Sequence, residues 1–122
     1  MTAASDTVDV LGGPVAWRTS GDTDAPVAVF LHGLGGNRTS WEPQLAGLQD
    51  VRRCCAWELP GYGDSPGRVE SLPQVAALAA EWITGLSESP VDVVGLSLGG
   101  MVAQHLALDH PHLVRTLALL DT

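Results

Sequence analysis

The sequence predicts an α/β fold with a mainly parallel sheet and helices on both faces of that sheet. Short apolar runs typical of buried strands alternate along the chain with longer segments whose apolar residues recur at helical spacing. Clusters of glycine and proline separate these segments. The chain has 122 residues, of which 45% are hydrophobic, so we expect residues 1–122 to contribute to a single domain.

Six strands are expected, and they comprise residues 8–11, 15–19, 27–31, 53–57, 91–94 and 117–120. The first two flank Gly12 and Gly13, which favour a hairpin turn. Residues 27–31 are apolar at every position, as in a parallel strand that helices cover on both sides.

Three helices are expected, over residues 41–48, 72–86 and 98–109. Asn37 and Thr39 are alternative N-caps of the first helix, and Ser71 is the expected N-cap of the second. Pro111 ends the third helix because proline blocks its continuation. Helices that alternate with strands in this way connect parallel strands by crossovers.

Composition and charge argue against several classes of function. The formal net charge is −8 and the chain contains no lysine, which disfavours nucleic acid or an anionic membrane surface as a partner. The N-terminus lacks the features of a secretory signal, and no apolar run is long enough to span a membrane. Cys54 and Cys55 are adjacent in a predicted strand, where neighbouring side chains point to opposite faces. We therefore expect free buried thiols and a cytoplasmic location.

The most informative motif is Gly95-Leu96-Ser97-Leu98-Gly99, which joins a predicted buried strand to a predicted helix. A serine at such a turn is held in strained backbone geometry with its hydroxyl exposed. Gly95 and Gly99 flank it because a Cβ at either position would clash across so sharp a turn. The N-terminus of the following helix favours negative charge at the site. This arrangement presents a serine as a nucleophile.

Two further motifs follow predicted strands. Residues 31–36, Leu-His-Gly-Leu-Gly-Gly, form a glycine-rich loop that can aim a backbone N–H at a developing oxyanion. Residues 59–65, Leu-Pro-Gly-Tyr-Gly-Asp-Ser, follow the next strand. Three motifs at strand ends, in this order, are a much more specific signal than the serine motif alone.

With these motifs the chain resembles the α/β-hydrolase superfamily, and in particular small bacterial serine esterases and enol-lactone hydrolases. The resemblance covers nearly the whole chain but only the N-terminal half of the family's domain. It implies a three-layer α/β-hydrolase fold that stops after the strand following the nucleophile helix, without the lid and the C-terminal strands.

The resemblance also implies roles for individual residues. Ser97 is the implied nucleophile, and the backbone N–H groups of Leu34 and Leu98 are the implied oxyanion hole. His32, in the first motif, is implied to tie down the oxyanion loop. Family members often carry aspartate where this chain has Glu58, and we expect this exchange to be a structural variation of a loop.

The acid and the histidine of the family follow the serine in the chain. Here His105 lies about two helical turns beyond Ser97, and His110 and His112 flank the helix-ending proline, so none sits where the base is expected. Asp121 is a candidate acid because its strand is expected to lie beside that of the serine. The alternative is a polar residue that only ends a buried strand.

These observations favour a cofactor-free serine hydrolase that cleaves small ester, lactone or thioester carbonyls through an acyl-enzyme. The sequence contains no spacing typical of a metal site, a Rossmann fingerprint or a P-loop. Two alternatives stay open: a non-catalytic truncated fragment that acts as an assembly or binding half, and an acyltransferase. The last predicted strand would form an apolar sheet edge that favours self-association or a C-terminal companion segment.

Overall fold

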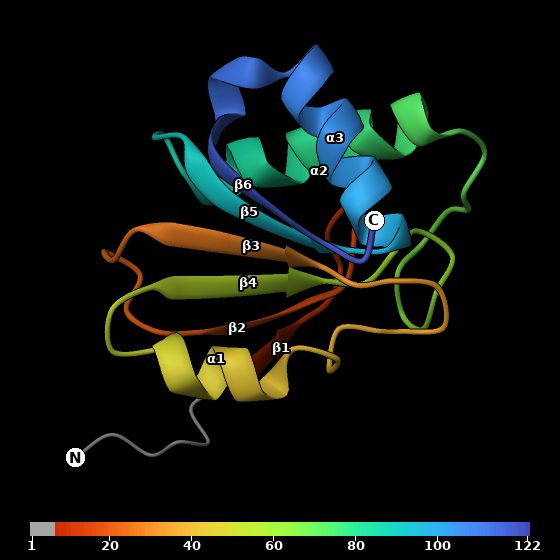
Figure 1. The fold of residues 1–122 in the computed structure, drawn as a ribbon. Helices are drawn as coiled ribbons and strands as arrows, with labels where there is room; N and C mark the ends of the chain where they lie inside the picture. Colours follow the sequence, from red (N-terminus) through yellow and green to blue (C-terminus); the bar gives the residue numbers. More distant parts are fainter. Residues whose placement is uncertain (1–6) are drawn as a thin grey trace.

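A computed structural model describes residues 7–122 and shows three layers, as predicted (Figure 1). A six-stranded sheet lies between helix α1 (Glu42–Leu48) on one face and helices α2 (Leu72–Leu86) and α3 (Leu98–Asp109) on the other. The strands are β1 (Val8–Val10), β2 (Trp17–Ser20), β3 (Val27–Leu31), β4 (Arg53–Trp57), β5 (Val91–Leu96) and β6 (Val114–Leu120). A short 3-10 turn, Pro111–Leu113, joins α3 to β6.

The order of the strands in the sheet is β1-β2-β4-β3-β5-β6. Strands β4, β3, β5 and β6 are parallel, and the β1–β2 hairpin adds to β4 in the antiparallel direction. The carboxyl ends of parallel strands meet at one edge of the sheet, which is where open α/β sheets bind their ligands. The loops that carry all three sequence motifs therefore leave the sheet at this edge.

The core has two parts, one on each face of the sheet. Along β3, Val29 and Leu31 belong to the cluster under α2 and α3, whereas Ala28 and Phe30 belong to the cluster under α1. This alternation follows from the two-residue period of a strand. Cys54 and Cys55 also divide between the two clusters, and both are free and buried, as the sequence predicts.

Tryptophans contribute to both parts of the core. On the α2 side, the rings of Trp57 and Trp82 stack with centroids 5.8 Å apart and an interplanar angle of 24°. Trp17 meets Trp82 edge-on, at 5.8 Å and 70°. On the α1 side, Trp41 packs against Phe30 with ring centroids 5.2 Å apart. Such aromatic pairs stabilise a fold beyond the area that they bury.

The start of α1 differs from the sequence prediction. Its N-cap is Trp41, and neither Asn37 nor Thr39 caps it. The Asn37 carboxamide oxygen instead accepts the backbone N–H of Thr39 at 2.8 Å, and the Asn37 N–H donates to the hydroxyl of Ser40 at 3.0 Å. These short polar side chains stabilise local turns before the helix, which is the other conformation that they favour. The predicted cap of α2 is confirmed, because the Ser71 hydroxyl accepts the N–H of Gln74.

Strand β6 begins earlier than the sequence suggests, at Val114 instead of Leu117. The additional residues Arg115 and Thr116 are polar, but both side chains bond the carboxylate of Asp92 on the neighbouring strand β5. A pairing between strands offsets the unfavourable local pattern here.

Candidate active site

Ser97 occupies the turn between β5 and α3 and is exposed. Its backbone has φ 53° and ψ −113°, a conformation that L-residues other than glycine rarely adopt. A Cβ on Gly95 would lie 2.6 Å from the carbonyl oxygen of Gly99. A Cβ on Gly99 would overlap the carbonyl oxygen of Leu31. The two glycines therefore allow a turn whose strain is held by close packing on both sides.

The glycine-rich loop after β3 packs directly against this turn. A Cβ built on Gly33 would lie 3.3 Å from the Cβ of Ser97. The loop forms a turn closed by the Gly36 N–H, which donates to the carbonyl oxygen of Gly33 at 2.9 Å. Gly35 has φ +83°, which the third residue of a type II turn requires.

Among residues 7–122, two backbone N–H groups near the serine have no hydrogen-bond acceptor. Leu98 is the first residue of α3, where the N–H has no partner inside the helix. Within residues 7–122, the N–H of Leu34 donates to neither a backbone nor a side-chain oxygen. Leu98 directly follows Ser97 in the chain, and Leu34 directly follows Gly33, which packs against Ser97. Both N–H donors therefore belong to residues next to the nucleophile or to its packing partner. Donors of this kind stabilise the negative oxygen of a tetrahedral intermediate.

His32 holds the glycine-rich loop to the loop after β4. Its Nε2 accepts the N–H of Leu59 at 3.0 Å, so this nitrogen is unprotonated. The proton is then on Nδ1, which donates to the carbonyl oxygen of Gly33 at 2.8 Å. Burial lowers the pKa of His32, although the Gly33 carbonyl and the charge of Glu58 oppose that shift. His32 is thus a neutral link between two loops, with both nitrogens engaged.

The other three histidines lie away from the nucleophile. His105 is half-buried on α3, and His110 and His112 flank Pro111 at the far end of that helix with ring centroids 6.5 Å apart. Within residues 7–122, the only histidine that makes hydrogen bonds through its side chain is His32, and none of these bonds reaches Ser97. The described residues therefore bring no imidazole to the serine hydroxyl.

Asp121 lies beside the nucleophile turn. The backbone N–H of Ser97 donates to the carbonyl oxygen of Leu120, the residue before Asp121, at 2.9 Å. Asp121 is exposed and has φ 49°, so the chain turns sharply at the end of β6. This position puts the aspartate at the edge of the sheet where Ser97 lies, as expected of parallel neighbours.

Glu58 corrects an expectation from the sequence. Its side chain is only 2% exposed and comes directly after β4. One carboxylate oxygen accepts Arg38 Nη1 at 2.7 Å and the N–H of Asp64 at 2.8 Å, and the other accepts the N–H of Arg38 at 3.2 Å. This residue is a buried ionic anchor and not a simple loop variation. A carboxylate that directly continues a buried strand was the available signal, since a buried charge needs a partner.

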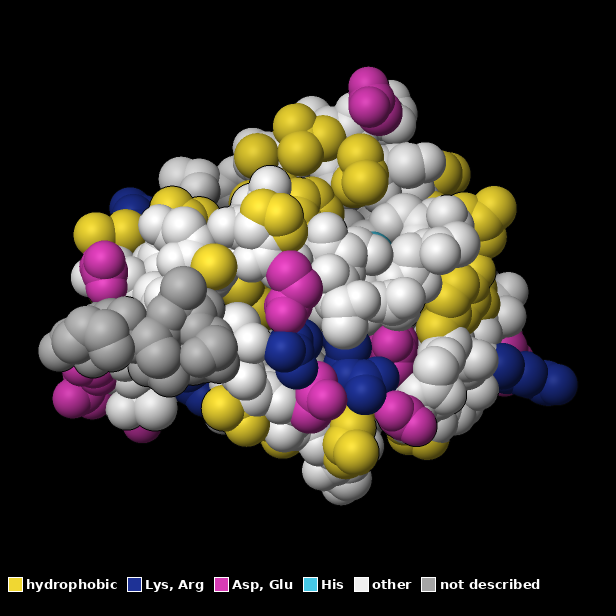
Figure 2. All heavy atoms as spheres, turned by 90° about the horizontal axis from the view of Figure 1, so that it is seen from below, with side chains coloured by type: hydrophobic (Ala, Val, Ile, Leu, Met, Phe, Trp, Pro, Cys, Tyr) yellow, Lys and Arg dark blue, Asp and Glu magenta, His cyan; other side chains and the backbone are white. Residues whose placement is uncertain are grey.

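The Glu58–Arg38 pair is part of a larger ion network. Arg38 also contacts Asp9 at 3.0 Å and Asp64 at 3.0 Å, and its hydrogen bond lowers the pKa of Asp9. Asp9 in turn contacts Arg18 at 2.9 Å. Figure 2 views the molecule from the α1 side and shows basic and acidic side chains next to one another near the centre of that face.

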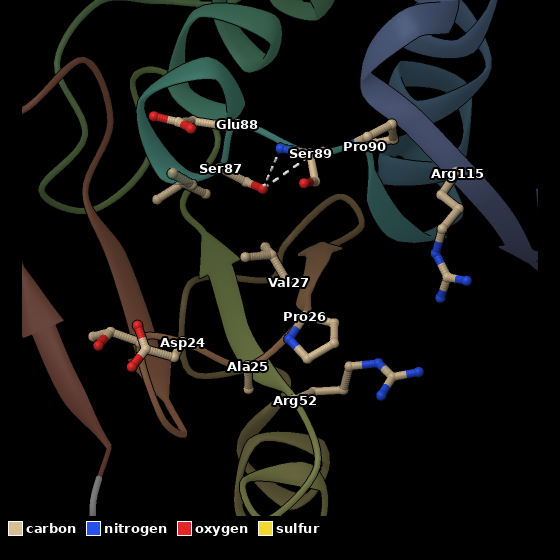
Figure 3. A pocket seen from close by; sticks show the side chains of 12 residues that line it. Asp24, Ala25, Pro26, Val27, Arg52, Ser87, Glu88, Ser89, Pro90 and Arg115 are labelled. Atoms are coloured by element: carbon tan, nitrogen blue, oxygen red, sulfur yellow. Dashed lines mark hydrogen bonds between the residues drawn. The ribbon is translucent and has the colours of Figure 1, made fainter.

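A pocket of about 930 Å³ lies at the amino ends of the parallel strands, opposite to the end where Ser97 lies (Figure 3). Its lining includes Pro26 before β3, Arg52 before β4, Pro90 before β5 and Arg115 near the start of β6. These residues mark the amino ends of the parallel strands, whereas Ser97 follows a carboxyl end. The pocket is therefore separate from the nucleophile turn. Among residues 7–122, no group of three or more potential metal ligands occurs, and no helix has the length and apolar character needed to cross a bilayer.

Comparison with known proteins places this geometry in a family. A family model described as alpha/beta hydrolase fold matches residues 26–122. RutD from Escherichia coli O44:H18, named as a carbamate hydrolase, is 38% identical over 91 residues, which are 72% of this chain and 34% of that protein. RutD from Escherichia coli K12 strain DH10B is 37% identical over 97 residues, 77% of this chain and 36% of the relative. The chain thus spans little more than a third of the length of these relatives.

Solved structures agree along almost the whole chain. An α/β-hydrolase from Nostoc sp PCC 7120 superposes with a TM-score of 0.86 and 29% identity, over 98% of this chain and 44% of the other. Epoxide hydrolase VrEH1 from Vigna radiata, at 22% identity, shares the fold with a TM-score of 0.89 over 99% of this chain and 42% of its own. With a family model that matches most of its length and solved structures that share its fold, the chain belongs to the α/β-hydrolase family.

Proposed function

We propose that this chain provides the nucleophile part of a serine hydrolase that cleaves small ester, lactone or thioester carbonyls. The observation that carries the proposal is the exposed Ser97 with its φ of 53°, beside the N–H groups of Leu34 and Leu98, which have no acceptor among the described residues. The name of the RutD relatives adds carbamates, whose carbonyl carbon is open to the same attack.

In the proposed reaction the Ser97 hydroxyl oxygen attacks the carbonyl carbon while a base takes the hydroxyl proton. The N–H groups of Leu34 and Leu98 stabilise the resulting oxyanion. The intermediate then collapses to an acyl-enzyme, and the leaving group departs with a proton from the protonated base. Attack by water on the acyl-enzyme releases the acid and restores the serine.

Among the described residues, no histidine side chain hydrogen-bonds to Ser97. We propose that a companion segment supplies the histidine, and that Asp121 is the candidate acid that orients it. The companion would add to β6, an edge strand of the sheet formed by residues 7–122, which exposes Leu117, Leu119 and Leu120 by 38%, 38% and 44%. Without a companion, we expect this edge to pair with a second copy of the chain.

Labelling with a fluorophosphonate probe, together with turnover of p-nitrophenyl esters, tests the proposal. In the protein that includes the histidine-bearing segment, replacing Ser97 by alanine should abolish both, since loss of a catalytic serine has lowered kcat by about 10⁶-fold in a well-studied protease. Ser89→Ala, at an exposed turn away from the site, is the matched control and should behave as the wild type. Turnover that survives in Ser97→Ala would mean that another residue attacks.

The same assay separates the two alternatives. An acyltransferase would form a new ester when an alcohol acceptor is added, whereas a hydrolase would release only the acid. A non-catalytic half would neither label nor turn over ester, even with its companion present. The free, buried thiols of Cys54 and Cys55 support a reducing compartment, and we propose the cytoplasm.

A further inference from the structure

The loop that carries the Leu34 N–H is fastened at both of its ends to the loop after β4. At the first end, the His32 imidazole accepts the N–H of Leu59 at 3.0 Å. At the second end, both the N–H and the guanidinium of Arg38 donate to the Glu58 carboxylate, at 3.2 and 2.7 Å. Residues 33–37 therefore span the gap between two fixed points.

The loop after β4 is a rigid reference for these contacts. The Ser65 hydroxyl donates to the Glu58 carbonyl oxygen and accepts the N–H of Ala16 at 2.8 Å, which ties the loop to the segment before β2. Asp64 donates its N–H to the Glu58 carboxylate at 2.8 Å. Gly63, with φ +49°, passes so close to that carboxylate that a Cβ would overlap it.

We propose that Glu58 is a positioning residue for the oxyanion hole: through Arg38 it holds the Leu34 N–H at the distance from Ser97 that oxyanion binding requires. Gly33 packs against Ser97, and the next N–H in the chain is that of Leu34. A shift of the loop would therefore move the Leu34 N–H relative to Ser97. This inference rests on the proposed serine hydrolase function.

Glu58→Gln in the full-length protein is the test, since it keeps the shape of the side chain but places an amide donor among N–H groups that need acceptors. We expect kcat to fall about tenfold or more with KM little changed, because loss of one oxyanion-hole donor costs about 10² to 10³ in kcat. The inhibition constant of a boronic acid, which mimics the tetrahedral intermediate, should rise by the same factor. Hydrogen exchange of residues 33–38 should become faster.

Glu42→Gln is the matched control. Glu42 lies at the other end of the same ion network, where it pairs with Arg18 at 2.9 Å and its side chain is 38% exposed. Within residues 7–122, its carboxylate accepts hydrogen bonds only from Arg18 and from no residue of the loop that carries Leu34. Its kcat, boronic acid affinity and loop exchange should equal those of the wild type. If Glu58→Gln does not fold, the same measurements on Arg38→Lys test the inference. Lysine keeps the positive charge but lacks the planar guanidinium that bonds Glu58, so the same losses are expected.

Unchanged kcat and boronic acid affinity in a folded Glu58→Gln or Arg38→Lys protein would overturn the inference. An equal loss in Glu42→Gln would also overturn it, because the effect would then belong to the whole ion network. Neither result bears on the proposal that Ser97 is the nucleophile. That proposal is overturned separately, if Ser97→Ala keeps its activity.

Discussion

The backbone N–H of Ser97 donates to the carbonyl oxygen of Leu120 with an N···O distance of 2.9 Å. This bond extends the ladder between β5 and β6 by one residue into the strained turn. The turn is thus held by β6 on one side and by the packing of Gly33 on the other. A strained backbone conformation persists only where the surrounding structure holds it, and here β6 and the loop after β3 do so.

Replacing Gly99 by alanine should destabilise the protein severely. The added Cβ would overlap the carbonyl oxygen of Leu31 and lie 2.6 Å from the carbonyl oxygen of His32. Leu31 ends the central strand β3, whose backbone cannot move aside. We expect the free energy of unfolding to fall by about 3 kcal/mol or more, the upper end of overpacking costs. Urea denaturation measures it.

Two other glycines allow a comparison with that substitution, and Gly85 is its control. A Cβ on Gly100 would overlap the side chain of Thr122, so this second position should also be destabilised by alanine. A Cβ on Gly85 in α2 meets nothing within 4 Å, and alanine there should stabilise by about 0.4–1 kcal/mol. Equal losses at Gly99 and Gly85 would contradict the packing described at the turn.

Stability should decrease in mild acid because of His32. Burial lowers its pKa in the folded protein, so the unfolded chain takes up a proton first as the pH falls. The contribution of His32 to the free energy of unfolding should be fully present above the ordinary histidine pKa of about 6.5. Below that pH it should fall by up to about 1.4 kcal/mol per pH unit, until the lowered pKa is reached.

His32→Gln isolates this effect, because glutamine retains an acceptor for the Leu59 N–H but does not titrate. Unfolding curves of both proteins at a series of pH values should diverge only below about pH 6.5. Parallel curves throughout that range would show that His32 is not buried and neutral in the folded protein.

The two cysteines should be unreactive in the folded protein. Burial raises the pKa of Cys55 to about 11 and also raises that of Cys54, and the thiolate is the reactive form. A disulfide reagent such as DTNB should therefore label both thiols only after denaturation. An exposed cysteine introduced by Ser89→Cys should react at once under the same conditions, and native labelling of the natural pair would disprove their burial.

Helix α1 should depend on a single side chain. Leu45 is its only buried residue and is 0% exposed, whereas Leu48 in the same helix is 37% exposed. Leu45→Ala should lower the free energy of unfolding by about 2–5 kcal/mol, as for other buried leucines. Leu48→Ala should cost far less, and similar losses at both positions would argue against the observed packing of α1.

Much of this structure could be predicted because its signals are local. The turn at Ser97 follows from the glycines on either side, and the Ser71 cap and the end of α3 before Pro111 depend only on neighbouring residues. The alternating clusters of the core follow from strand periodicity, which also placed Cys54 and Cys55 on opposite faces.

The features that sequence reasoning missed depend on residues far apart in the chain. Nothing near Glu58 indicates which of the arginines will pair with it, and Arg38 lies 20 residues away. The early start of β6 depends on the contacts of Arg115 and Thr116 with Asp92 of another strand, more than 20 residues earlier. Such pairings are decided by the assembled sheet and leave no periodic pattern in the sequence.

The arrangement of the tryptophans gives each face of the sheet its own optical signal. The stacked rings of Trp57 and Trp82, with Trp17 edge-on, are close enough for their electronic transitions to couple, which produces a strong near-ultraviolet circular dichroism signal. Trp41 lies against Phe30 on the opposite face, so the part of the fluorescence change that disappears in Trp41→Phe reports on the α1 layer. Dichroism and fluorescence recorded during unfolding can therefore show whether the two layers are lost together or one after the other.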